Sequence, residues 1–275
     1  MKNIGLWKLI HAVAAALVAS MACTAAAAAA CPRKDALNTV RVLAVDAATT
    51  PRVGLKSFPQ TLPLGDHEVV LTFDDGPWPP TTRRVLAALA NECVRATFFV
   101  IGKLASEHPD LMRRIAAEGH SIGHHTWSHP SLARIPPAQA VEQIERGIAA
   151  DEMALHGVNT TAPSTPFFRF PGFESTPATL DLLQSRGIVV FGADLWASDW
   201  NPMTPKRELK LITGRLEIAR KGIILLHDSK ARTAAMLPTF LRYLRDHHYR
   251  VVHLVSAAPG ARAGLTPKPA LKSPN

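Results

Sequence analysis

Residues 69–76 read Val-Val-Leu-Thr-Phe-Asp-Asp-Gly, an apolar run that ends in two adjacent carboxylates and a glycine. A short apolar run rich in β-branched and aromatic residues is typical of a buried strand. Two carboxylates at the end of such a strand can take part in binding a divalent cation. The stretch therefore predicts a buried strand with reactive side chains at its carboxyl end.

The pattern of a short apolar run followed by an amphipathic segment repeats along the chain. The expected strands cover about residues 69–73, 96–100, 121–124, 167–170, 188–192, 223–226 and 250–254. The expected helices cover about residues 81–91, 110–118, 137–156, 177–186, 205–220 and 237–246. Strands that alternate with helices indicate an α/β fold with a mainly parallel sheet. About seven such units without a glycine-rich nucleotide turn favour a distorted (β/α) barrel over an open doubly wound sheet.

Chemically useful side chains follow these strands. The carboxyl ends of barrel strands converge on one rim, where the active sites of such barrels lie. We therefore expect residues far apart in the sequence to become neighbours at that rim, namely Asp74, Asp75, His125, His129, Arg169, Asp199, His227 and Asp228.

Part of this set has the composition of a metal site. Asp74 and Asp75 supply carboxylates, and His125 and His129 have a four-residue spacing that suits one face of a helical turn. Together they can hold one divalent cation and leave a coordination position open for chemistry. Without the histidines, the Asp-Asp-Gly segment could equally be a turn that caps a helix. His124 adjoins the pair at a different spacing, and we assign it a structural role.

Five short motifs carry a resemblance to a known family. They are residues 72–77 (Thr-Phe-Asp-Asp-Gly-Pro), 125–129 (His-Thr-Trp-Ser-His), 168–172 (Phe-Arg-Phe-Pro-Gly), 199–200 (Asp-Trp) and 225–228 (Leu-Leu-His-Asp). Through these motifs, residues 67–255 resemble the polysaccharide deacetylases, the group that includes chitin, peptidoglycan and xylan deacetylases. Each motif alone is weak, but five in the same order are specific. The resemblance implies a single catalytic domain over residues 67–255.

The resemblance also implies roles around a metal. Asp75, His125 and His129 would bind one divalent metal ion per chain, most commonly zinc, and Asp74 would be the general base. A cation makes bound water acidic, and the free carboxylate accepts its proton. His227 would be the general acid for the leaving amine, because the pKa of a histidine lies near neutrality. The alternative for His227 is a core histidine satisfied by hydrogen bonds.

A supporting pair is implied as well. In the resembling enzymes, the residue at Arg169 holds the base at Asp74, and the residue at Asp199 orients the arginine. A carboxylate beside a guanidinium stays ionised, as a base must. A purely structural salt bridge is the alternative interpretation.

Four residues are expected at the substrate. Gly172 stands where many relatives carry an aromatic residue whose backbone N–H stabilises the oxyanion, and Phe173 follows it. Glycine has a backbone N–H as the aromatic residue does, so a hydrogen-bond donor for the oxyanion is still present. Leu225 would line the pocket for the acetyl methyl group. Trp200, and also Trp127 or Trp196, could offer a flat surface to a sugar ring, although core packing is the more frequent use of a tryptophan.

The two ends of the chain are expected to lie outside the catalytic domain. Residues 1–30 combine Lys2 and Lys8, a short apolar stretch and an alanine run, which is the pattern of a cleaved secretory signal. This pattern predicts a periplasmic or secreted protein with no membrane span after cleavage, and lipid attachment at Cys23 or Cys31 is the alternative. Residues 31–66, where prolines break any regular pattern, are expected to form an N-terminal extension, and residues 256–275 a disordered basic tail.

Composition narrows the range of partners. The 275 residues are 47% hydrophobic and 19% charged, and their formal net charge is +9, so the chain is globular and basic. A basic exported protein is attracted to anionic envelope polymers or phospholipid headgroups. Nucleic acid is a poor partner, because the basic residues are scattered and not interleaved with aromatic residues. Cys31 and Cys93 would be the cysteines left after cleavage, either as a disulfide or as two unpaired thiols.

We therefore expect a metal-dependent hydrolase that removes N-acetyl groups from an acetylated amino-sugar polymer or oligomer of the chitin or peptidoglycan type. The same residues could serve an O-acetyl xylan ester or a small amide. An alternative from another class is a carbohydrate-binding relative without turnover. Asp74 and His227 argue against it, because a binding module has no use for a base and an acid around a metal.

Overall fold

The computed structural model describes Cys31 and residues 33–257, and a ten-stranded sheet forms its centre. All strand pairs in these residues are parallel. The hydrogen-bonded order is β1-β10-β3-β4-β5-β6-β7-β2, and β9 pairs with both β3 and β8. The strands are β1 (Thr39–Val45), β2 (Arg52–Val53), β3 (Glu68–Asp74), β4 (Thr97–Val100), β5 (Ser121–His124), β6 (Phe167–Phe168), β7 (Val189–Phe191), β8 (Leu195–Trp196), β9 (Gly222–His227) and β10 (Arg250–Ser256).

One chain segment brings the sheet back toward its starting point. Strand β7 pairs with β6, and β8, a few residues later in the same segment, pairs with β9. Strand β9 in turn pairs with β3, from which β4, β5 and β6 follow in order. No ladder joins β7 to β8 in the described residues, so the ring of hydrogen-bonded strands stays open between these two short strands. This arrangement is a distorted (β/α) barrel, as predicted.

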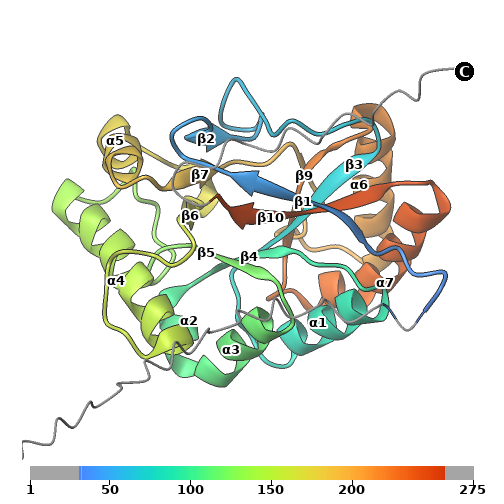
Figure 1. Cartoon of the computed structure of the whole chain (residues 1–275), viewed down its shortest axis with the longest axis horizontal. Helices are drawn as coiled ribbons and strands as arrows, with labels where there is room; N and C mark the ends of the chain where they lie inside the picture. The colour runs from blue at the N-terminus through green and yellow to red at the C-terminus, as the bar shows by residue number, and fades with distance from the viewer. Residues whose placement is uncertain (1–30, 32, 258–275) are drawn as a thin grey trace, which may run out of the picture. The chain divides into compact units, whose positions relative to one another are not determined.

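Helices lie outside the strands (Figure 1), and α1 packs against α7, α2 and α3 against α4, and α6 against α7. Their bounds are α1 (Thr81–Asn91), α2 (Gly102–Glu107), α3 (Pro109–Ala117), α4 (Pro137–His156), α5 (Pro177–Ser185), α6 (Pro205–Ala219) and α7 (Ala231–Asp246), with a short 3₁₀ turn η1 (Pro171–Phe173).

Local sequence signals explain where several helices begin and end. Helices α4, α5 and α6 each start on a proline, whose missing N–H costs nothing in a first turn. The Thr176 hydroxyl accepts from the Thr179 N–H, and the Thr179 hydroxyl accepts from the Thr176 N–H, which makes a reciprocal cap for α5. Helix α4 ends at Gly157, whose φ of 70° is left-handed. A side-chain cap at a helix N-terminus, such as that of Thr176, contributes about 1 kcal/mol.

Strand β3 is buried along its whole length and ends at Asp74, one of the predicted site residues. Val69, Leu71 and Phe73 pack in the main core cluster with residues of α1 and α7, whereas Val70 packs in a second cluster on the other face. Side chains alternate between the two faces of a strand, so Thr72 and Asp74 share the face of Val70. Asp74 therefore points to the side where the polar residues described below lie.

All seven predicted strands are present, but the region before them is more ordered than predicted. Strand β1 pairs with β10 and β2 pairs with β7, although residues 31–66 were expected to lack regular structure. A disulfide joins Cys31 and Cys93, with 5.8 Å between their Cα atoms. This bond and the β1–β10 ladder make the extension part of the folded unit.

Two helices also differ from the prediction. Helix α2 was not anticipated, and α7 starts at Ala231 and contains Pro238, although a proline usually marks a helix end. No helix of the described residues is long and apolar enough to cross a membrane. The predicted signal segment and nearly all of the predicted tail lie outside the described residues.

Candidate active site

Nine of the eleven predicted site residues line one cavity of about 350 Å³. Arg169 and Asp199 do not line it, because both are fully buried behind the residues that do. The residues that line the cavity are Lys56, Asp74, Asp75, His125, His129, Phe170, Gly172, Phe173, Trp200, Leu225, His227 and Lys230. Residues from the ends of β3, β5 and β9 therefore meet at one rim, as the barrel topology predicts.

Asp75, His125 and His129 bring one ligand atom each within 4.8 Å of one another. Asp75 Oδ1 lies 3.5 Å from His125 Nε2 and 3.2 Å from His129 Nε2. This oxygen is buried and has no hydrogen-bond partner in the described residues. Burial opposes its ionisation, but the two imidazoles hold the pKa of Asp75 far below its usual range.

The tautomer of His125 suits a metal ligand. His125 Nδ1 lies 2.7 Å from the Arg169 carbonyl oxygen, which can only accept, so Nδ1 carries the hydrogen. Nε2 then keeps a lone pair that points at Asp75. A carbonyl behind a histidine is the usual support of a zinc ligand. Two imidazole nitrogens and one carboxylate oxygen fit a divalent cation of the zinc type with room for a further ligand.

The two histidines do not lie on a helical turn, as their spacing had suggested. They lie in the loop after β5, where Thr126 and His129 have φ values of 68° and 62°. The His129 N–H donates to Thr126 Oγ1 at 3.0 Å. Gly147 of α4 lets the loop approach, because a Cβ there would lie 2.6 Å from the Thr126 carbonyl carbon. Left-handed backbone at two positions, which spacing alone does not reveal, brings both imidazoles to Asp75.

Arg169 holds Asp74 from inside the barrel. Its Nη1 donates to Asp74 Oδ1 at 2.7 Å and to Thr72 Oγ1 at 2.8 Å. Its Nη2 donates to the Gly192 carbonyl at 2.8 Å, and its Nε to the Phe191 carbonyl at 3.3 Å. The second oxygen of Asp74, Oδ2, lies 3.8 Å from His125 Nε2 and so faces the metal-ligand cluster.

The prediction that Asp199 orients Arg169 is wrong. The donors of Arg169 are taken by Asp74, Thr72 and two backbone carbonyls, whereas Asp199 contacts His227. Asp199 Oδ1 lies 2.7 Å from His227 Nδ1, and Oδ2 accepts from the His227 backbone N–H at 2.7 Å. Burial alone would lower the pKa of His227, but the hydrogen bond and charge of Asp199 raise it to about 9.

A hydrogen-bond chain continues behind Asp199 to a residue that the sequence analysis missed. The Thr233 hydroxyl lies 2.9 Å from Asp199 Oδ2 and 2.9 Å from Glu208 Oε1. Glu208 is fully buried, and burial raises its pKa to about 7. In the sequence, Glu208 looks like an ordinary charge on a basic helix, so no signal distinguished it.

Two further buried acids support the rim. Asp228 accepts from Thr82 Oγ1 and packs against Gly76, where any Cβ would collide with it. Burial raises the pKa of Asp228 to about 7. Asp151 of α4 lies 2.7 Å from His124 Nδ1, and both side chains are buried. His124 is thus paired with an acid behind the loop and does not belong to the metal-ligand cluster.

The remaining wall of the cavity is aromatic and apolar. Gly172 and Phe173 form a left-handed turn with φ values of 60° and 62°. Trp200 is 48% exposed, and its ring lies 6.1 Å from that of His227. Leu225 is buried beneath the cavity. Neither Trp127 nor Trp196 lines the cavity.

Comparisons with known proteins identify relatives of this chain by sequence and by fold. Residues 62–191 match the family described as polysaccharide deacetylase. A chitooligosaccharide deacetylase of Rhizobium leguminosarum bv. trifolii is 48% identical over 164 residues, 59% of this chain and 72% of that protein. The peptidoglycan-N-acetylglucosamine deacetylase PgdA of Listeria monocytogenes is 31% identical over 189 residues, 68% of this chain and 38% of that protein. A peptidoglycan deacetylase of Bdellovibrio bacteriovorus has a similar structure, with a TM-score of 0.71, 28% identity, and coverage of 82% of this chain and 61% of that one.

Proposed function

Because this chain belongs to the polysaccharide deacetylase family, we propose that it is a metal-dependent hydrolase that removes N-acetyl groups from a chitin-type or peptidoglycan-type glycan. One observation carries the proposal. The Asp75, His125 and His129 ligand atoms converge in the cavity that Asp74 and His227 also line. A carbohydrate-binding relative without turnover would not need a base and an acid around a metal-ligand cluster.

Asp75, His125 and His129 would hold the cation, with zinc favoured by the nitrogen and oxygen donors. When bound there, a divalent cation supplies a Lewis acid that polarises an amide carbonyl and makes water more acidic. Burial alone would lower the pKa of His129, but the hydrogen bond and charge of Asp75 raise it above its usual value. Metal binding would therefore compete with a proton at His129.

Asp74 is proposed as the general base. Arg169 fixes its Oδ1, which leaves Oδ2 directed toward the metal-ligand cluster. A charged hydrogen bond of this kind holds the carboxylate in one orientation. Asp74 would accept a proton from the attacking water as the water oxygen bonds to the acetamide carbon.

His227 is proposed as the general acid. Asp199 accepts from its Nδ1, so the proton to be transferred is on Nε2, which lies 3.9 Å from Asp75 Oδ2 and therefore faces the cluster. As the bond between the carbonyl carbon and nitrogen breaks, His227 would give this proton to the nitrogen, and the products would be acetate and a free amine.

The cavity wall would position the sugar. We propose the Gly172 N–H as a donor to the developing oxyanion and Leu225 as the wall beside the acetyl methyl group. Phe173 and the half-exposed Trp200 would pack against the sugar ring. The Cys31–Cys93 disulfide, remote from this wall, fits an exported, periplasmic or secreted protein, because disulfides persist in oxidising compartments.

The test is acetate release from N-acetylated chitin oligomers, peptidoglycan and acetylxylan. The protein is assayed as purified, after chelation, and after zinc is added back. We expect release from the first two substrates that chelation abolishes and zinc restores. Release from acetylxylan alone would favour the ester alternative, and no release from any of the three by the zinc-loaded protein would exclude the enzyme.

A further inference from the structure

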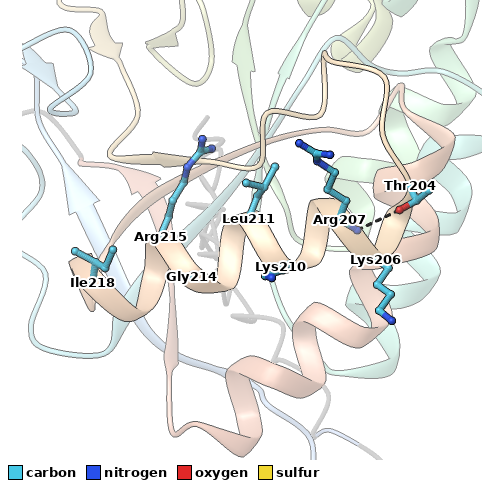
Figure 2. Close-up of a pocket in the computed structure, with 8 residues that line it drawn as sticks. All are labelled: Thr204, Lys206, Arg207, Lys210, Leu211, Gly214, Arg215 and Ile218. Atoms are coloured by element: carbon cyan, nitrogen blue, oxygen red, sulfur yellow. Dashed lines mark hydrogen bonds between the residues drawn. The ribbon is translucent and has the colours of Figure 1, made fainter.

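Helix α6 presents an unusually basic outer face beside a second cavity. The basic face of α6 consists of Lys206, Arg207, Lys210 and Arg215, which line a hollow of about 730 Å³. Figure 2 shows the side chains of Arg207 and Arg215 rising from one side of the helix, whereas Lys206 points away from them. These residues have no role in the proposed reaction.

The charge on this face is not neutralised locally. None of its four cations lies within 4.0 Å of a carboxylate in the part of the chain that the structure describes. The two acids of α6 face elsewhere, since Glu208 is buried against Thr233 and Glu217 accepts from the Tyr243 hydroxyl. An ordinary solvated helix face usually mixes both signs.

The basic face continues into the catalytic cavity. Arg215 donates to the Trp196 carbonyl and to Ser198 Oγ at 2.9 Å, and its guanidinium carbon lies 5.1 Å from the centre of the Trp196 ring. Lys56 Nζ lies 5.2 Å from the centre of the same ring, and Lys56 lines the catalytic cavity. The backbone of Lys56 is fixed, because its N–H donates to the Ala193 carbonyl at 2.8 Å.

We propose that the basic face of α6, continued through Trp196 and Lys56, binds an acetylated glycan that carries carboxylate groups and leads it to the catalytic cavity. This inference rests on the proposed function, and of the two glycan types proposed there it favours the acidic one as the preferred substrate. Lys230 adds a second cation at the cavity. A row of positive charges along a cleft raises the local concentration of an anionic polymer and increases its association rate.

A glycan fits this surface better than a phospholipid membrane. An interfacial helix needs a broad apolar face beneath its charges. Among the residues that line the hollow of α6, only Ile218 is a strongly exposed apolar residue, with 87% exposure, whereas Leu211 is half-buried. The cations also lead toward the catalytic cavity, which suits a polymer that must reach the metal-ligand cluster.

The test compares R207Q/K210Q with the control R83Q/R84Q, which removes two charges from α1 at exposed residues that line neither cavity. On neutral N-acetylated chitotetraose, both variants should keep kcat and KM within about twofold of wild type, since exposed charges contribute little to the binding of an uncharged substrate. On acidic peptidoglycan sacculi, R207Q/K210Q should raise KM about fivefold or more, as expected for two lost ion pairs. Its KM should also depend less on salt between about 50 and about 300 mM.

A sedimentation assay keeps the inference separate from the proposed function. Wild type and R83Q/R84Q should sediment with sacculi, R207Q/K210Q should do so several-fold less, and all three should bind neutral chitin equally. This readout needs no turnover. Equal sedimentation of R207Q/K210Q and wild type with sacculi would overturn the inference even if chitotetraose is deacetylated. Loss of binding to phosphatidylglycerol vesicles, with unchanged sacculus binding, would also overturn it.

Discussion

Asp199 binds His227 through both of its carboxylate oxygens, one on the imidazole Nδ1 at 2.7 Å and one on the backbone N–H at 2.7 Å. A carboxylate in this position only accepts, so Nδ1 carries a hydrogen and Nε2 is the nitrogen left for chemistry. The two bonds also fix the ring plane. The pair therefore sets both the tautomer and the direction of the proposed acid.

Asp199→Asn tests this relationship. The amide keeps the shape of the side chain but loses the charge that stabilises protonated His227, so we expect kcat on chitotetraose to fall by about a hundredfold or more. Zinc content should stay at one ion per chain, because Asp199 does not contact the metal-ligand cluster. Acetate assays and metal analysis on the same preparation check both points. An unchanged kcat would show that the proton of His227 is not used.

Proton counting around Thr233 leads to a second prediction. Its single hydroxyl hydrogen cannot serve both Asp199 and Glu208 at 2.9 Å, so one of these acids must be protonated. Burial raises the pKa of Glu208 to about 7, so we expect Glu208 to be the acid that carries the proton and donates to Thr233. Glu208→Gln, which still donates, should retain near wild-type kcat. Thr233→Val should lower kcat about tenfold at unchanged KM, because Asp199 loses a bond worth about 1–3 kcal/mol.

The control for the hydrogen bonds from Asp199 through Thr233 to Glu208 compares two substitutions of Glu208. Glu208→Ala removes the donor and leaves Thr233 unsupported, so it should resemble Thr233→Val and not Glu208→Gln. If Glu208→Gln and Glu208→Ala lower kcat equally, the loss comes from packing, and the hydrogen bond from Glu208 to Thr233 has no role in turnover. Thermal unfolding of each variant separates stability from turnover.

Asp74 and His129 should separate catalysis from metal binding. Asp74→Asn keeps the acceptor for Arg169, so the fold and metal content should persist while kcat falls by about a hundredfold or more. His129→Ala removes one of three ligands and should weaken zinc affinity by more than about a hundredfold. Competition with a chelator measures the affinity. Full activity of Asp74→Asn would reassign the base, and full zinc affinity of His129→Ala would reassign the metal site.

The sequence predicted the positions of the strand ends but not the pairing between side chains. Residues after β3, β5 and β9 converge because parallel strands end at one rim, which follows from topology alone. That Asp199 meets His227 and not Arg169 depends on β8, which has two residues and no periodic pattern. The left-handed φ of Thr126 and His129 also could not be predicted from the sequence, because neither residue type requires it. Strand β1 left a weak signal in the apolar residues of 40–45, where the alternate residues Leu43 and Val45 are buried but Val40 and Val42 are exposed.

The disulfide should stabilise the domain without affecting the chemistry. It joins residues 62 positions apart, and closing a loop of that length in the unfolded chain is worth about 4 kcal/mol. Cys93 precedes β4 and so lies at the amino end of the strands, away from the rim. Cys31→Ser/Cys93→Ser should therefore unfold at lower temperature or denaturant, with kcat at 25 °C unchanged. Equal unfolding midpoints with and without the bond would show that the N-terminal ladder alone holds the extension.

Two buried histidines away from the site should make the fold sensitive to acid. The His120 Nδ1 accepts from the Ala96 N–H at 3.1 Å, so it carries no proton, and burial lowers the pKa of His120 to about 3. Repulsion from Arg95, and from His253 when it is protonated, contributes to the same lowering of the pKa. Burial and Arg95 likewise lower the pKa of His253 to about 4. Glu118, whose carboxylate lies 4.0 Å from His120 Nε2, is the nearest acid and does not outweigh burial.

In the folded protein, the pKa values of His120 and His253 both lie below the unfolded value of 6.5. Between these values, the histidines of the unfolded chain bind protons that those of the folded chain do not bind. Stability is then fully present above about pH 6.5 and falls as the pH drops toward 4, by on the order of a few kcal/mol. His120→Asn keeps an acceptor for Ala96 and cannot protonate, so its free energy of unfolding should change less between pH 7 and pH 4. Urea unfolding measures this slope, with the exposed His247→Asn as the control. If His120→Asn and His247→Asn both lose stability as steeply as wild type, His120 is not a source of the acid sensitivity.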